Sequence, residues 1–196
     1  YPPDGESTSI RIGKNNQLSN NLGYFNVSIG SGALQNNVNG ESNMAIGTEA
    51  LYANYNGIKN TAVGVNSLKN NQGNFNTGIG YLSLYGNILG NDNIGLGYAT
   101  LQNNVNGSAN VAIGNSALFA DTSIYNVAIG VEALRIVVVG FLNTAIGFRT
   151  GYNATGSYNV FIGQQAGYNE TGDNKLYIES GASATPLIYG DFANDT

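Results

Sequence analysis

The stretch SANVAIGNSAL, residues 108–118, recurs in near copies along most of the chain. Residues 91–101 read NDNIGLGYATL, and residues 124–134 read IYNVAIGVEAL. The glycine that closes each NVAIG-like phrase returns every 16 or 17 residues, at Gly13, Gly30, Gly47, Gly64, Gly80, Gly97, Gly114, Gly130, Gly147 and Gly163. A short period that varies so little is typical of a solenoid, in which each repeat forms one rung.

Each column of the repeat has its own chemistry. The position four residues before the glycine is Asn in nine repeats: Asn26, Asn43, Asn60, Asn76, Asn93, Asn110, Asn126, Asn143 and Asn159. A branched apolar residue stands just before the glycine, and a very small residue stands two before it, as in Ala112-Ile113-Gly114. Leu stands four residues after the glycine in seven repeats, and Gly151 and Gly167 replace it in the last two. These two glycines predict a change of packing at that end.

The NVAIG phrase predicts a short strand, because apolar and small residues alternate along it. We expect Val and Ile to point into a packed interior together with Leu, and the small residues to face another sheet. The prediction is an all-β fold, a parallel β-roll of about ten rungs with two short strands each, about 45 Å long at ~4.8 Å per rung. The small-residue face suits close approach by sister chains, which predicts an oligomer.

Composition excludes several function classes. The chain has 196 residues, a net charge of −5 and only 7 Lys and Arg, so too few cations are present for a typical nucleic-acid interface. It contains no Cys and no His, which removes thiol nucleophiles, zinc-thiolate sites and the commonest general base. No apolar run approaches the ~18 residues of a membrane span. The segments 90–92 and 170–173 match no calcium loop, so we expect no metal and no cofactor.

A variable column lies five residues after each glycine. It reads Gln35, Tyr52, Lys69, Tyr85, Gln102, Phe119, Arg135, Tyr152 and Tyr168. If Leu points inward, this neighbouring column points outward, and its rings Tyr52, Tyr85, Phe119, Tyr152 and Tyr168 are candidate sugar-binding residues. The alternative is that the rings only shield the edge of the next rung. This alternative is favoured, because a binding role inferred from residue type and spacing is a weak inference.

The charged residues predict no catalytic pair. The acids Glu41, Glu49, Asp92, Asp121, Glu132, Glu170 and Asp173 never share a column in adjacent rungs, whereas a glycosidase needs two carboxyl groups about 5–9 Å apart. We therefore expect no catalytic residue. Glu132 and Arg149 do share a column in successive rungs, which predicts an exposed ion pair. The apolar turn RIVVVG at 135–140 is either a partner-binding patch or a turn buried between subunits.

The phrase N-[VT]-A-I-G-x-x-A-L resembles the head repeat of trimeric autotransporter adhesins. With its N-x-x-x-G return, the rung is more similar to the repeat region of phage and large-virus tail fibres. Residues 174–192, NKLYIESGASATPLIYGDF, resemble the segment that precedes an intramolecular chaperone of the endosialidase type. The resemblance implies a homotrimer about a threefold axis, with the β-roll in 1–172 and a C-terminal β connector in 173–196.

The resemblance also implies a function. The expectation is a non-enzymatic fibre segment of a virion that attaches to a glycan or protein receptor on a host cell. A bacterial surface adhesin head and a glycan-degrading tailspike with an intersubunit site are the alternatives.

Overall fold

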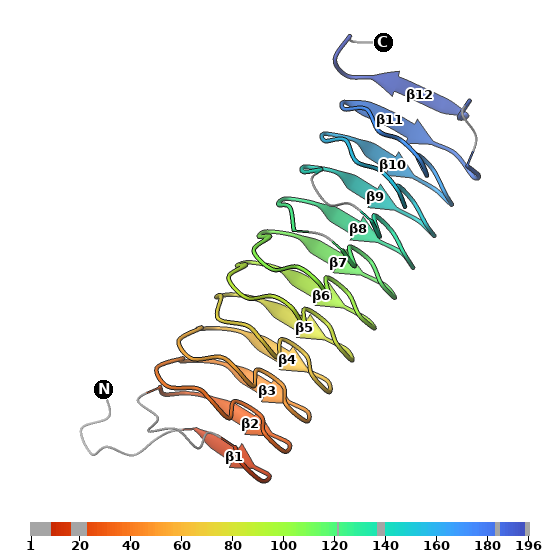
Figure 1. Ribbon diagram of the computed structural model, residues 1–196. Coiled ribbons are helices and arrows are strands. Elements are labelled where there is room, and N and C mark those ends of the chain that lie inside the picture. Colours follow the sequence, from red (N-terminus) through yellow and green to blue (C-terminus); the bar gives the residue numbers. More distant parts are fainter. Residues whose placement is uncertain (1–8, 17–22, 121, 137–139, 183–184, 195–196) are drawn as a thin grey trace.

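The computed structural model of the chain is a single stack of rungs, with β1 at one end and β12 at the other (Figure 1). The structure describes residues 9–16, 23–120, 122–136, 140–182 and 185–194. Every regular element among these residues is a strand, and none is a helix long and apolar enough to cross a bilayer. The strands are β1 (Ile10–Ile12), β2 (Val27–Ile29), β3 (Met44–Ile46), β4 (Thr61–Val63), β5 (Thr77–Ile79), β6 (Ile94–Leu96), β7 (Val111–Ile113), β8 (Val127–Ile129), β9 (Thr144–Ile146), β10 (Val160–Ile162), β11 (Lys175–Ile178) and β12 (Ile188–Asp191).

All of these strands lie in one sheet in the order of the sequence. Strands β1 to β11 each pair in parallel with the next strand, and β12 turns back antiparallel to β11. Paired residues are one repeat apart, as Ala112 and Ala128 are, so every column of the sequence becomes a row along the stack. The predicted parallel β-solenoid is confirmed. The sheet also continues across the expected boundary at 172, because β11 extends it in register.

Each rung has a second hydrogen-bonded side, which carries the Leu column. Leu51 N donates to Ser67 O at 3.1 Å, and Leu101 N donates to Ala117 O at 3.0 Å in the same way. The predicted second strand corresponds to this side, which bends because its leucine is left-handed, with φ between 47° and 54° in all seven rungs. Gly151 and Gly167 hold the same conformation in the last two rungs, with φ of 57° and 59°.

The predicted orientation of the strand was wrong. The small residues are fully buried inside the roll, as Ala45, Ala112 and Ala145 show, whereas Ile79 is 42% exposed. The reason is the narrowness of the interior, which the leucines of the second side already fill. A Cβ on Gly78 would lie only 3.2 Å from Leu68 Cγ, so the strand position that faces the leucines has room only for a small side chain.

This orientation predicts that the substitution Ala112→Leu destabilises the isolated chain by about 1–3 kcal/mol, because the added atoms overpack a closed interior. Val111→Leu, one residue away on the outward face, should change stability much less. Urea unfolding of the two variants provides the comparison. Equal effects of the two substitutions would contradict the assignment of the faces.

Two buried rows of asparagine connect the rungs. In the first row, Asn43 N donates to Asn26 Oδ1 at 2.9 Å and Asn26 Nδ2 donates to Gly40 O at 2.8 Å, a pattern that later rungs repeat. In the second row, Asn54 Nδ2 donates to Asn37 Oδ1 at 3.0 Å. Asparagine side chains therefore connect successive rungs along the stack. At the first rung Ser9 takes the place of Asn, and its hydroxyl accepts a hydrogen bond from Asn26 N at 3.1 Å.

The glycine that closes each strand is required by both conformation and space. Gly114 has a φ of 125°, which L side chains rarely adopt. A Cβ there would lie 2.6 Å from the carbonyl carbon of Gly130 in the next rung. The glycine thus permits rungs to stack at the spacing of a β-ladder.

The packing changes near β10, as the missing leucines predicted. Phe161 replaces the small residue of the strand and is fully buried. A Cβ on Gly151 would lie 2.8 Å from the Phe161 ring, and one on Gly167 would overlap the same ring. One large side chain on the strand therefore occupies the space that two leucines would otherwise fill.

Candidate functional site

The variable column forms a row of partly buried side chains along the second side of the stack. In its first part, Lys69 lies between two rings, with Nζ 5.7 Å from the Tyr52 ring centroid and 5.9 Å from that of Tyr85. Lys69 Nζ also forms an ion pair with Glu49 Oε2 at 2.7 Å. This hydrogen bond is the largest cause that raises the pKa of Lys69. In this part of the row, one cation, Lys69, is therefore paired with one carboxylate, Glu49.

The second part of the row contains the other three predicted rings. The Arg135 guanidinium lies 5.1 Å from the Phe119 ring centroid and 5.8 Å from that of Tyr152. Arg135 Nη1 donates to Tyr152 Oη at 3.0 Å. Tyr152 and Tyr168 are stacked, with centroids 5.1 Å apart and ring planes within 2°. Each part of the row thus contains one cation that lies between two rings.

These contacts bear on the two interpretations of the column. Tyr52, Tyr85, Phe119 and Tyr152 each direct a ring face at a cation of the same row, which supports shielding between rungs. Sugar binding by the five rings stays a prediction. Within the described residues, Tyr168 is the last ring of the row and has a ring partner on one face only.

An ion-pair cluster lies beside the second part of the row. The expected pair is present, with Arg149 Nε 2.6 Å from Glu132 Oε2, and its hydrogen bond is the largest cause that raises the pKa of Arg149. The columns of the repeat did not predict the second cation, Arg135, whose Nε lies 3.5 Å from Glu132 Oε1. Its spacing of three residues from Glu132 is the signal that could have indicated it.

Apolar residues recur along the outward face of the sheet, although polar residues such as Lys59, Asp92 and Asn115 interrupt the columns that flank the strands. The exposed residues on the strands include Ile10, Ile12, Met44, Ile79, Ile94, Ile129, Ile146 and Ile162. Exposed residues just after the strands add Val65, Tyr81, Tyr98, Val131 and Phe148. Exposed residues just before the strands add Phe25, Phe75, Tyr125, Leu142 and Tyr158. We call this set the strand face. No residue in the described part of the chain covers it.

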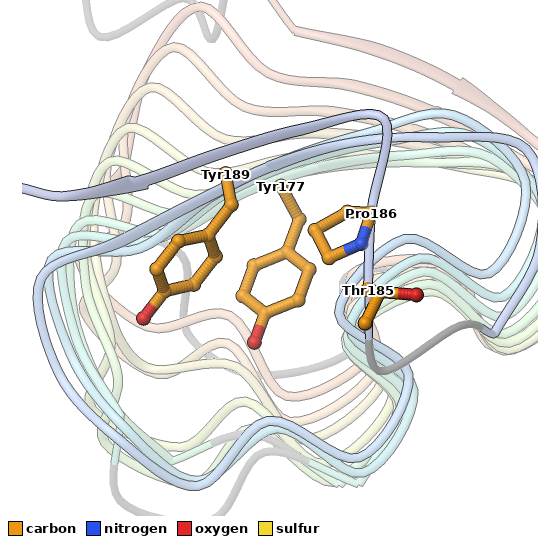
Figure 2. Close-up of a pocket in the computed structure, with 4 residues that line it drawn as sticks. All are labelled: Tyr177, Thr185, Pro186 and Tyr189. Atoms are coloured by element: carbon orange, nitrogen blue, oxygen red, sulfur yellow. The ribbon is translucent and has the colours of Figure 1, made fainter.

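A pocket of about 410 Å³ lies at the C-terminal end of the stack, lined by Tyr177, Thr185, Pro186 and Tyr189 (Figure 2). It forms because β12 reverses direction and places Tyr189 against Tyr177, with ring centroids 5.3 Å apart. Tyr177 Oη donates to Glu170 Oε2 at 2.5 Å. Burial is the largest cause that raises the pKa of Tyr177, and the hydrogen bond to Glu170 is the next. None of the four lining residues was predicted from the sequence as a site residue, although residues 173–196 depart from the repeat.

The acids of the described residues serve mostly as partners in ion pairs and hydrogen bonds. Glu49 and Glu132 pair with cations of the variable column, and Asp191 pairs with Lys175 at 2.8 Å. No group of three acids that could hold a metal occurs within the described ranges. Asp121 and the centre of the turn at 135–140, residues 137–139, lie outside the described residues.

Comparisons with known proteins give no match, so the function is inferred from the geometry of the structure. A scan against protein-family models matches no family, and searches of the curated proteins and of the solved structures find no match.

Proposed function

We propose that this chain is a rod-shaped segment of a viral fibre or spike, which assembles as a homotrimer and attaches to the surface of a host cell without enzymatic activity. The observation that carries the proposal is the strand face, an unpartnered apolar surface that follows the sheet from β1 to β10. The sequence resemblance to tail-fibre repeats supports the viral setting and the threefold assembly.

The size of the strand face is that of an assembly interface. Ten rungs at ~4.8 Å make it about 45 Å long, and the strands with their flanking columns make it roughly 20 Å wide. The resulting area is on the order of 900 Å². It is close to the ~800 Å² per partner of a standard interface. A face of this size is stabilised when sister chains cover it.

Assembly through the strand face is tested by charge insertion. We expect the wild-type chain to sediment as a trimer, and the double variant Ile79→Lys/Ile146→Lys to sediment as a monomer with an unchanged far-UV spectrum. Both residues point outward and lie four rungs apart, so the added charges act on the interface and not on each other. The control Gln72→Lys/Asn103→Lys adds the same charge at exposed turn positions and should leave the trimer intact. A stable wild-type monomer would contradict the proposal.

Attachment to host cells without enzymatic activity is tested with the same wild-type and variant proteins. The labelled trimer should bind to cells of a susceptible host and release no reducing ends from their surface polysaccharide. The monomeric double variant should bind far less, because linked sites gain 10²–10⁴ in avidity over single sites. Reducing-end release that disappears on mutation of one Asp or Glu would instead support a glycan-degrading tailspike.

A further inference from the structure

The two cation-bearing parts of the variable column differ in charge balance. Lys69 has one carboxylate partner, Glu49. In the second part, two guanidinium groups share the single carboxylate of Glu132. One positive charge is therefore left over at this place, in a chain whose net charge is −5.

The surplus charge is accessible. The side chain of Arg149 is 41% exposed and its hydrogen bond to Glu132 uses only Nε. Neither Nη of Arg149 has a hydrogen-bond partner within the described part of the chain. The Arg149 guanidinium also lies near two rings, 5.1 Å from the Phe148 centroid and 5.7 Å from that of Tyr152. These contacts hold the planar donor group in one orientation, which suits two parallel hydrogen bonds to a carboxylate.

An aromatic platform lies one rung further along. Tyr168 stacks on Tyr152, so its ring plane lies across the stack axis and its second face points toward the C-terminal end. No ring or cation among the described residues covers that face. Gln165 stands in the column of Arg149, in the rung that carries Tyr168, and is partly exposed. A cationic fork, an amide and a ring face without an aromatic or cationic partner among the described residues therefore occur within two rungs.

We propose that Arg149, Gln165 and Tyr168 form a binding site for a carboxylate-bearing oligosaccharide. Arg149 receives the carboxylate through its two Nη groups, Tyr168 stacks against the apolar face of a pyranose ring, and Gln165 bonds a ring hydroxyl. This inference rests on the proposed attachment function and names the class of receptor for it. The single surplus charge matches one carboxylate, and a neutral glycan would leave it unused.

The length of the site predicts that the ligand is longer than one sugar. The open face of Tyr168 lies beyond the second of two rungs, on the order of 10 Å from the level of Arg149. A ligand that contacts both groups spans adjacent sugars of a chain that runs along the stack. Three copies of the chain in a trimer present three such sites, so polymers should bind more tightly than single sugars.

The test is isothermal titration calorimetry of the full chain with two carboxylated probes, oligogalacturonate and α2,8-linked oligosialate. The two probes separate a uronic acid source from a sialic acid source. Fully methyl-esterified oligogalacturonate is the neutral control, and dextran sulfate is the control for general polyanion attraction. We expect at least one carboxylated probe to bind, its ester not to bind, and dextran sulfate to bind more weakly.

Matched variants assign the binding to the site. Arg149→Gln and Tyr168→Ala should each lower affinity about tenfold or more, because a charge-assisted hydrogen bond or a ring contact is lost. Lys69→Gln removes a cation from the charge-balanced part of the column, and Tyr55→Ala removes an exposed ring outside the column. Both controls should keep wild-type affinity. Thermal unfolding of all four variants checks that each one is folded.

The outcomes separate this inference from the proposed function. Binding of neither carboxylated probe, binding of dextran sulfate as tight as theirs, or equal losses in both pairs of variants would overturn the site. Attachment of the wild-type trimer to cells would then still support the fibre function. A wild-type chain that neither assembles nor attaches to cells would overturn the fibre function itself, whatever the probes show.

Discussion

Replacing Asn93 by alanine should lower the free energy of unfolding by about 1–3 kcal/mol, because the side chain bonds backbone groups of the next rung. Asn93 Nδ2 donates to Gly107 O at 2.8 Å, and Asn93 Oδ1 accepts a hydrogen bond from Asn110 N at 3.1 Å. Asn110 N is buried between rungs and loses its partner when the amide is removed, whereas Gly107 O keeps the hydrogen bond from Asn104 Nδ2 at 2.9 Å. One unsatisfied buried group costs about 1–3 kcal/mol.

The control for this change is Asn103→Ala. Asn103 belongs to the same rung, is exposed, and has no side-chain hydrogen bond in the described structure, so its loss should change stability by about 0.5 kcal/mol or less. Chemical unfolding followed by far-UV circular dichroism measures both variants. Similar small effects of the two substitutions would mean that water replaces the amide and that the asparagine row contributes little.

Phe161→Ala should cost about 3–5 kcal/mol, because it empties the space that the ring fills between Gly151 and Gly167. The structure also predicts a rescue. The triple variant Phe161→Ala, Gly151→Leu and Gly167→Leu restores the pattern of the earlier rungs, in which leucine holds the same left-handed conformation. It should recover most of the lost stability in the same unfolding measurement.

The single variant Gly167→Leu tests the same packing from the opposite direction. It should destabilise the chain, because its side chain overlaps the Phe161 ring, yet it should stabilise the chain in the Phe161→Ala background. This change of sign is the signature of shared space between neighbours. Additive effects would show that the ring and the glycines pack independently.

Much of the arrangement of the variable column follows from the period of the sequence. Because paired residues lie one repeat apart, the sequence order Tyr52, Lys69, Tyr85 is also the spatial order of the row. The pair of Glu132 and Arg149 follows from the same rule. The contact of Arg135 with Glu132 does not follow from the period, because these two residues stand in different columns of the repeat, on either side of the bend in the second side. The C-terminal pocket likewise depends on the reversal of β12, where the repeat no longer applies.

The sequence by itself determined the rungs, their stacking in parallel and the rows of asparagine and glycine, because a constant period of 16 or 17 residues leaves one register in which like columns meet. Only the tertiary structure decided which face of the strand is inside. The alternation along the strand places the small residues on one face and the branched residues on the other. It does not determine which of the two faces lies inside the roll. The leucines of the second side settle the choice, since they fill a narrow interior and leave space for alanine but not for isoleucine. The same choice places the isoleucine row on the surface, where it forms the strand face.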